Sequence, residues 1–130
     1  MHELNRGTSD RFMRKRIGIN GFGRMGRLSL RAGWGRKEFE WVRINEINMG
    51  ANCGAHLLNF DSVQGRWNVE ANCRNDKIII NDHKIAYTSV ACIEKAEWGD
   101  CDIVLECTGN FRTPQQLQKF FDQGVKKVIV

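Results

Sequence analysis

Short apolar runs alternate with glycine-rich and polar segments along the chain, and the first of these runs predict a strand, a helix and a second strand. Residues 16–20 predict a short strand because apolar side chains alternate there with small or polar ones. After a glycine-rich turn, about ten helix-forming residues follow, with Leu28 and Leu30 as their apolar positions. Residues 39–44 predict the next strand, which ends at Asn45. This order indicates parallel neighbouring strands that are joined through a helix.

Further apolar runs predict a helix, a hairpin and a buried strand. The helix is expected over residues 53–60. Residues 77–80 and 85–87 flank a polar turn, and they therefore predict a hairpin at the periphery of the sheet. Residues 103–105 are wholly apolar, as expected for a strand of a parallel sheet that is covered on both faces.

The sharpest helix boundary lies in the last part of the chain. Thr113 is predicted as the N-cap, Pro114 as the first helical residue and Gln116 as the partner in a capping box. Gly124 is predicted to end this helix in the left-handed conformation. The apolar residues expected to line one helix face are Leu117, Phe120 and Phe121. Residues 128–130 predict one more strand, so the chain ends inside an element and we expect a piece of a longer protein.

Together these elements indicate an α/β fold of the Rossmann type, which is a doubly wound, mostly parallel sheet, here with an inserted hairpin. A chain of 130 residues has the size of one domain. We therefore divide it into a basic N-terminal leader over residues 1–15 and one folded domain over residues 16–130, incomplete at its C-terminal end.

The net charge of +5 is concentrated at the start of the chain, where five basic residues oppose two acidic ones within the first sixteen positions. A basic leader ahead of the first apolar element is usually solvated, so nucleic-acid binding is not favoured. No apolar run approaches the roughly 20 residues of a membrane span. The leader has neither the apolar block of a secretory signal nor the acid-poor composition of a mitochondrial transit peptide. We therefore expect a cytoplasmic protein.

Five cysteines occur without a C-x-x-C spacing, namely Cys53, Cys73, Cys92, Cys101 and Cys107. An odd number in a chain without a secretory signal predicts reduced thiols. Cys53 and His56 are three residues apart and are placed to share a helix face, but no second pair of metal ligands accompanies them. We therefore predict no metal site, with Cys53 as a small buried side chain and His56 on the surface.

The strongest local pattern is GFGRMG at residues 21–26, which follows the first predicted strand and begins the first predicted helix. Gly21 permits a tight turn, Gly23 removes a side chain that would keep a diphosphate away, and Gly26 lets helix and strand pack closely. The diphosphate of a dinucleotide is then bound by main-chain amides at the helix N-terminus.

Glu46 lies about twenty residues past Gly26, at the end of the second strand, where a carboxylate binds the ribose hydroxyls of adenosine. The same charge repels a 2′-phosphate, so the pattern favours NAD over NADP, with Arg43 or a nearby lysine as the positive charge that opposes this discrimination. The alternative for Glu46 is a solvated loop acid.

Four segments resemble glyceraldehyde-3-phosphate dehydrogenases. RIGINGFGRMGR at residues 16–27 resembles the opening signature of that family. HLLNFDSVQGRW at residues 56–67 is similar to its LLxYDSxHG segment, ECTGNF at residues 106–111 to its ESTGxF, and KKVIV at residues 126–130 to its KKVI. The resemblance covers the chain from Arg16 to its end. It implies the N-terminal NAD-binding domain of a tetrameric enzyme that oxidises a phosphorylated aldehyde with NAD and adds inorganic phosphate.

The resemblance also implies cofactor contacts at matching positions. These are Asn20, Gly21, Phe22, Gly23, Arg24, Met25 and Gly26 around the phosphates, Glu46 at the adenosine ribose, and Thr108, Gly109 and Phe111 near the nicotinamide-side ribose. Three residues depart from the family pattern, since Glu46 replaces an aspartate, Gln64 a histidine and Cys107 a serine. The longer arm of Glu46 changes its reach toward a ribose, and a thiol at position 107 forms a weaker hydrogen bond.

No catalytic residue is predicted within the chain. The catalytic cysteine of the family lies in an SCTTN segment that this sequence does not contain, and the three histidines are not in contexts that suggest a partner base. Cys107 is therefore expected to line the cofactor pocket or to pack in the core.

The leading hypothesis is the NAD-binding part of a phosphorylating dehydrogenase. Met25, Asn59 and Trp67 resemble most the branch of the family associated with arsenic resistance, in which arsenate takes the place of phosphate. One alternative is a stand-alone, non-catalytic NAD-binding module or decayed fragment. Another is a nucleic-acid-binding protein that uses the basic leader.

Overall fold

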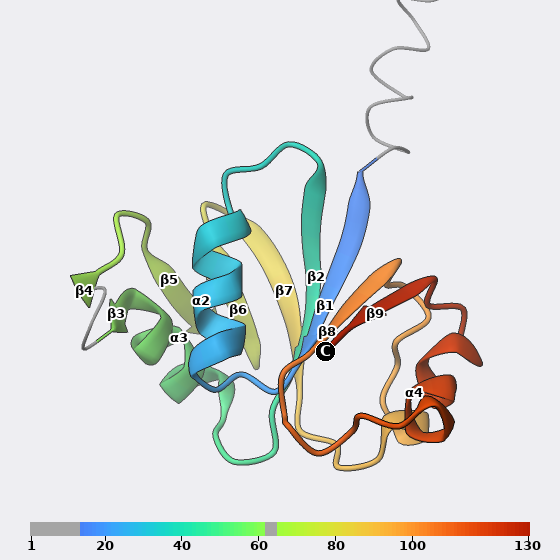
Figure 1. Cartoon of the computed structure of the whole chain (residues 1–130). Helices are drawn as coiled ribbons and strands as arrows, with labels where there is room; N and C mark the ends of the chain where they lie inside the picture. The colour runs from blue at the N-terminus through green and yellow to red at the C-terminus, as the bar shows by residue number, and fades with distance from the viewer. Residues whose placement is uncertain (1–13, 62–64) are drawn as a thin grey trace, which may run out of the picture.

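Seven strands form one twisted sheet in the computed structural model, which describes residues 14–61 and 65–130 (Figure 1). Across the sheet these strands are β5 (Ala71–Arg74), β6 (Lys77–Ile80), β7 (His83–Thr88), β2 (Phe39–Asn45), β1 (Lys15–Asn20), β8 (Ile103–Glu106) and β9 (Lys127–Ile129). All neighbours from β7 to β9 pair in parallel, whereas β5, β6 and β7 pair antiparallel. The parallel part has the strand order of the Rossmann fold, so the predicted fold class is confirmed.

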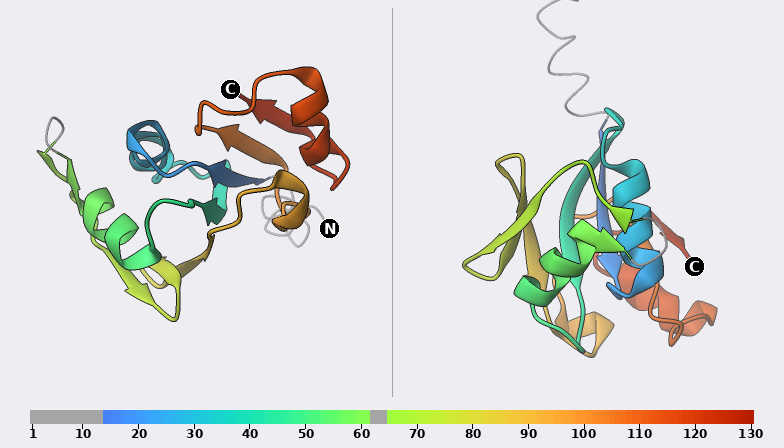
Figure 2. Two further views of the ribbon diagram at one scale, coloured as in Figure 1. Left: turned by 90° about the horizontal axis from the view of Figure 1, so that it is seen from below. Right: turned by 90° about the vertical axis from the view of Figure 1, so that its left-hand side faces the viewer.

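Helices cover both faces of this sheet (Figure 2). The helices α2 (Arg24–Gly33) and α3 (Ala51–Asn59) lie on one face, and the short 3-10 helix η1 (Ile93–Lys95) and α4 (Pro114–Phe121) lie on the other. A two-stranded ribbon of β3 (Phe60–Asp61) and β4 (Gly65–Arg66) follows α3 at one end of the molecule. Of the helices within the described ranges, none combines the length and the apolar character of a membrane span.

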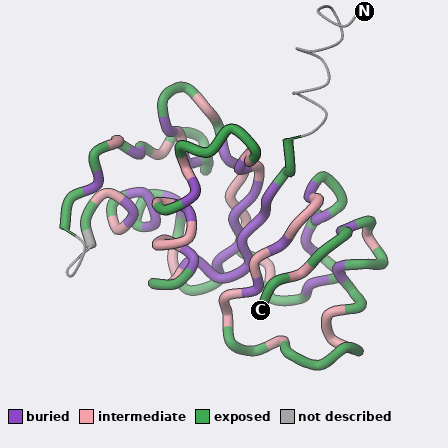
Figure 3. Tube along the Cα trace, turned by 45° about the horizontal axis from the view of Figure 1, so that its top comes forward, coloured by how far each residue is buried: buried purple, intermediate pink, exposed green. Residues whose placement is uncertain are grey.

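Two apolar clusters hold the layers together, one on each face of the sheet. Leu30 of α2 and Leu58 of α3 are fully buried in the first cluster. In the second, the ring of Phe120 from α4 packs edge-on against Trp98 with 5.4 Å between the ring centroids. The buried parts of the chain, purple in Figure 3, therefore run through the strands and the inward faces of the helices.

Both ends of α4 form as the sequence predicts. The main-chain N–H of Gln116 donates to Thr113 Oγ1 at 3.2 Å, and the N–H of Thr113 donates to Gln116 Oε1 at 3.2 Å, which completes the capping box. Gly124 has a φ of 104°, and the next amide, Val125 N, donates to Phe120 O at 3.3 Å. A left-handed glycine with this bond pattern ends a helix, and here it turns the chain toward β9.

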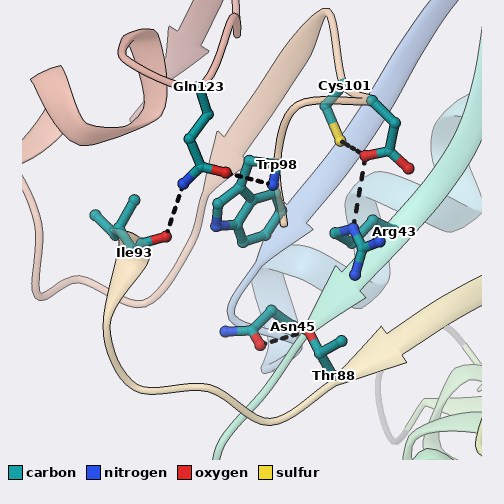
Figure 4. A network of polar contacts seen from close by, with 8 residues as sticks. Arg43, Asn45, Thr88, Ile93, Trp98, Cys101 and Gln123 are labelled. Atoms are coloured by element: carbon teal, nitrogen blue, oxygen red, sulfur yellow. Dashed lines mark hydrogen bonds and ion pairs between the residues drawn. The ribbon is translucent and has the colours of Figure 1, made fainter. Parts of the chain in front are cut away.

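Gln123 ties the end of α4 to the segment that precedes β8. Its Oε1 accepts a hydrogen bond from Trp98 N at 2.8 Å, and its Nε2 donates to Ile93 O at 3.0 Å (Figure 4). Both bonds join groups that are 25 to 30 residues apart in sequence. They therefore fix α4 on the face of the sheet opposite to α2.

The structure corrects three details of the sequence-based predictions. β1 begins at Lys15, one residue before the predicted strand, and residues 1–13 of the predicted leader lie outside the described residues. The strand β5 is an addition that turns the predicted hairpin into three antiparallel strands. Phe121 is 39% exposed, because successive residues of an α-helix point about 100° apart and Phe120 takes the inward direction.

Candidate functional site

A cleft of about 220 Å³ opens at the carboxyl ends of β1, β2 and β8. Its lining combines the ends of these strands with the loops that follow them: Asn20, Gly21, Gly23, Asn45, Glu46, Ile47, Asn48, Val90, Ala91, Cys107, Thr108, Asn110 and Phe111. The helix that follows β1 covers one face of the sheet, and the helix that follows β8 covers the other. Such a switch point beyond the carboxyl ends of parallel strands is the usual ligand site of an open α/β sheet.

The glycines of the turn between β1 and α2 have different steric roles. Gly21 has a φ of 96°, a conformation that favours glycine. A methyl group at Gly26 would overlap the main-chain oxygen of Gly21, so only glycine lets α2 pack directly on the turn. A methyl group at Gly23 would meet no described atom within 4 Å. The turn and packing roles predicted for Gly21 and Gly26 are thus confirmed, and Gly23 borders open space in the cleft.

The N-terminus of α2 is suited to an anion. Among the described residues no side chain caps it, and its first turn contains no acidic residue. On the other side of the turn, Arg27 Nη1 donates to Phe22 O at 3.0 Å and fixes the main chain. An uncapped helix N-terminus carries a partial positive charge and unpaired amides, so it attracts negative groups.

Glu46 lies in the wall of the same cleft and is only 7% exposed. Its Oε1 accepts a hydrogen bond from Phe22 N at 2.6 Å, and its Oε2 accepts one from Asn48 N at 2.8 Å. The carboxylate therefore joins the glycine turn to the loop that follows β2, and it is not a solvated loop acid. Each carboxylate oxygen retains a lone pair for a further donor.

The side chains of the three non-glycine residues of the turn, Phe22, Arg24 and Met25, lie in different environments. Phe22 is fully buried and packs edge-on against Tyr87 with 6.3 Å between ring centroids. The side chain of Phe22 therefore belongs to the core, and its main-chain N–H is bonded to Glu46 Oε1. Arg24 and Met25 lie on the exposed side of the first turn of α2, where Met25 is 66% exposed.

Asn20 and Glu106, the last residues of β1 and β8, bond to each other inside the protein. Asn20 Nδ2 donates to Glu106 Oε1 at 2.7 Å, and Asn20 Oδ1 accepts from Asn45 Nδ2 at 2.9 Å. Glu106 Oε2 accepts from the amide of Thr108 at 2.9 Å and also from its hydroxyl. Asn20 and Glu106 are 3% and 4% exposed. The sequence predicts Asn20 as a phosphate contact, but its amide oxygen and nitrogen both bond to protein groups.

Sequence reasoning did not identify Asn45, Asn48 and Glu106 as site residues. Asn45 and Glu106 each end a parallel strand next to β1, and Asn48 supplies a main-chain donor to Glu46. The available signal is a polar residue directly after an apolar strand, since such residues meet at the carboxyl edge of a parallel sheet.

Cys107 lines the cleft and also packs against the core, as the sequence predicts. Burial raises the pKa of its thiol, and the negative charge of Glu106 raises it further. The two described histidines lie elsewhere, since His83 Nε2 bonds to Trp41 O and the His56 ring packs against Phe60. A thiol with a raised pKa is protonated at neutral pH, so Cys107 does not have the properties of an activated nucleophile.

Cys53 is exposed on α3, whereas the sequence predicts it as buried. The core side of α3 is occupied by Ala51, Gly54, Ala55 and Leu58. In the part of the chain that the structure describes, no three His, Cys, Asp or Glu side chains gather as a metal site, and all five cysteines are free. Gln64, which replaces a histidine of the family pattern, lies outside the described residues.

Comparison with known proteins adds a family relationship to this geometry. Residues 15–114 match the family described as "Glyceraldehyde 3-phosphate dehydrogenase, NAD binding domain". "Glyceraldehyde-3-phosphate dehydrogenase 3" of Nostoc sp. is 49% identical over 120 residues, which are 91% of this chain. The glyceraldehyde-3-phosphate dehydrogenases of Geobacillus stearothermophilus and Kluyveromyces lactis are 38% and 36% identical over 91% and 88% of this chain. The chain spans about 36% of the length of these three relatives.

Proposed function

Because the chain belongs to the glyceraldehyde-3-phosphate dehydrogenase family and is its NAD-binding domain, we propose that NAD binds in the cleft at the carboxyl ends of β1, β2 and β8. The observation that carries this placement is the open space at Gly23, next to the uncapped N-terminus of α2 and in one cleft with Glu46. A helix N-terminus suits a diphosphate, and a carboxylate at the next strand end suits a ribose.

Different residues of the cleft bind different parts of NAD. Main-chain amides at the N-terminus of α2, beside Gly23, bind the diphosphate, with Arg24 and Met25 at the exposed mouth of the turn. The amides of Gly21 and Phe22 already donate to Asn45 O and Glu46 Oε1 and shape the turn. Glu46 accepts hydrogen bonds from the adenosine ribose with its remaining lone pairs. On the opposite wall, Thr108, Gly109 and Phe111 border the nicotinamide-side ribose.

In the longer enzyme, this domain presents NAD to a phosphorylated aldehyde. NAD supplies the hydride acceptor, and the oxidised acyl group passes to inorganic phosphate, or to arsenate in its place. We place the nucleophile and its base in the part of the enzyme beyond this chain, because the Cys107 thiol is held protonated by burial. We also propose that the longer enzyme is a homotetramer, and that this chain alone does not oxidise the aldehyde.

Calorimetric titration of the 130-residue chain with NAD and with NADP tests the proposed cleft. We expect measurable binding of NAD and weaker binding of NADP, because the buried carboxylate of Glu46 repels a 2′-phosphate. Tighter binding of NADP, or no binding of NAD at millimolar concentration, would overturn the placement. In a parallel assay, aldehyde oxidation above a no-protein control would show that the catalytic residues lie within this chain.

A further inference from the structure

A continuous chain of hydrogen bonds crosses the carboxyl ends of four strands, from β7 through β2 and β1 to β8. Thr88 Oγ1 donates to Asn45 Oδ1 at 2.7 Å (Figure 4), and Asn45 Nδ2 donates to Asn20 Oδ1 at 2.9 Å. Asn20 Nδ2 then donates to Glu106 Oε1 at 2.7 Å. The series of hydrogen bonds ends at Glu106 Oε2, which accepts from both the amide and the hydroxyl of Thr108.

The donors and acceptors in this series of hydrogen bonds can be assigned in only one way. The main-chain amides of Val90 and Thr108 can only donate, so Asn45 Oδ1 and Glu106 Oε2 must accept. Glu106 Oε1 meets the amide nitrogen of Asn20, which is also a donor. All contacts of Glu106 therefore come from donors, which two carboxylate oxygens satisfy and a carboxamide does not.

This arrangement positions the segment of residues 107–111, the wall of the cleft that faces Glu46. Thr108 Oγ1 accepts in turn from Asn110 N at 3.0 Å, and Gly109 between them has a φ of 78°. The segment packs so closely on the glycine turn that a methyl group at Gly21 would lie 2.7 Å from Thr108 N. The bonds of Glu106 therefore hold Thr108 directly beside the glycine turn.

We infer that Glu106 is a positioning residue for the nicotinamide half of NAD, and that it acts by holding Thr108 and the segment 107–111 in place. Asn20 and Asn45 anchor Glu106 to the two neighbouring strands. The inference rests on the proposed binding of NAD across the cleft. It predicts that the adenosine half, bound by the glycine turn and Glu46, does not depend on Glu106.

Titration of wild-type and Glu106→Gln chains with NAD and with ADP tests this role. In E106Q a carboxamide NH₂ must face either Asn20 Nδ2 or the Thr108 donors, which leaves donors unpaired. We expect E106Q to weaken NAD binding about tenfold and to change ADP binding less than about twofold. A general structural role would weaken both ligands together.

Further variants separate positioning from folding. Thr108→Val removes the hydroxyl that bonds to Glu106, and Thr108→Ser restores one. If Glu106 acts through Thr108, the effects of E106Q and T108V on NAD binding are less than additive, and T108S loses less NAD affinity than T108V does. T108V tests the contact even if E106Q does not fold. Asn59→Ala is the matched control, because Asn59 lies outside the cleft. Its Oδ1 accepts from Ala71 N at 2.7 Å and its Nδ2 donates to Ala71 O at 2.8 Å. This variant should lower the stability of the fold without changing the preference for NAD over ADP.

The outcomes distinguish this inference from the proposed function. A wild-type chain that binds NAD more tightly than ADP, with the preference lost in E106Q, supports both. A preference that persists in E106Q and T108V overturns the positioning role and leaves the proposed cleft intact. A wild-type chain that binds ADP at least as tightly as NAD overturns the placement of the nicotinamide half, and the role of Glu106 with it.

Discussion

Glu46 accepts a hydrogen bond from the main-chain N–H of Phe22 at 2.6 Å, so the acidic end of β2 is joined to the glycine turn that follows β1. Because Glu46 also binds Asn48 N, its carboxylate stays in the cleft wall without a ligand. This geometry supports a preorganised ribose acceptor, in which little side-chain freedom is lost on binding.

Replacement of Glu46 by alanine should change cofactor preference. Without the carboxylate, the ribose hydroxyls lose an acceptor and a 2′-phosphate meets less repulsion. We expect E46A to bind NAD more weakly and NADP more tightly, so that the ratio of the two dissociation constants changes roughly tenfold or more. Calorimetric titration with both cofactors measures the ratio. Glu94→Ala removes a charge from the opposite face of the sheet, beside Lys119, and should leave the ratio unchanged. An unchanged ratio in E46A would show that Glu46 does not contact the ribose of the cofactor.

Two glycines of the same turn should respond differently to alanine. A methyl group at Gly23 points into open space, so G23A should change the free energy of unfolding by less than about 1 kcal/mol while weakening NAD binding at least about tenfold. A methyl group at Gly26 overlaps Gly21 O and lies 3.0 Å from Ile19 Cγ2, so G26A should lower the free energy of unfolding by about 2 to 3 kcal/mol. Urea unfolding and NAD titration of both variants measure these effects. Equal destabilisation by the two changes would mean that Gly23 is required for folding, not for the ligand.

These examples show which features the sequence determines locally. The capping box of Thr113 and Gln116 and the turn at Gly21 depend on residues within one or two turns of chain, so the local pattern was sufficient. The hydrogen bond between Asn20 and Glu106 joins residues 86 positions apart. It becomes visible only when the order of β1 and β8 in the sheet is known.

The errors have the same origin. The sequence of β5, ANCR, does not have a strong strand pattern. The strand forms because each of its residues pairs with a residue of β6. The sequence predicts Cys53 as a buried side chain, but it is exposed because Ala51, Gly54, Ala55 and Leu58 occupy the core side of α3. In both cases contacts between distant segments outweigh the local signal.

The cysteines should react with iodoacetamide in an order set by exposure and by pKa. Cys53 and Cys92 are exposed, whereas burial raises the pKa of the Cys101 and Cys107 thiols. A raised pKa leaves less thiolate at a given pH, so alkylation of Cys107 should be slow at pH 7.5 and should keep increasing above the ordinary thiol pKa of about 8.5. Mass spectrometry of peptides after timed labelling gives the rates. Bound NAD should protect Cys107, which lines the cleft, and not Cys53. Fast labelling of Cys107 at neutral pH would instead indicate an activated thiolate.

Gly18 of β1 should be about as sensitive to substitution as Gly26, although it lies outside the GFGRMG motif. A methyl group there would lie 2.6 Å from Cys101 Sγ and 2.9 Å from the Trp98 ring, so G18A should lower the free energy of unfolding by about 2 kcal/mol. Cys101→Ala removes the nearer atom, and the double variant G18A/C101A should therefore lose less stability than the sum of the two single changes. Gly35→Ala is the control, since a methyl group at Gly35 meets no described atom within 4 Å and should cost less than about 0.5 kcal/mol. Urea unfolding of the four variants measures the coupling. Strictly additive losses would show that Cys101 does not limit the space above β1, and that Trp98 alone requires a glycine at position 18.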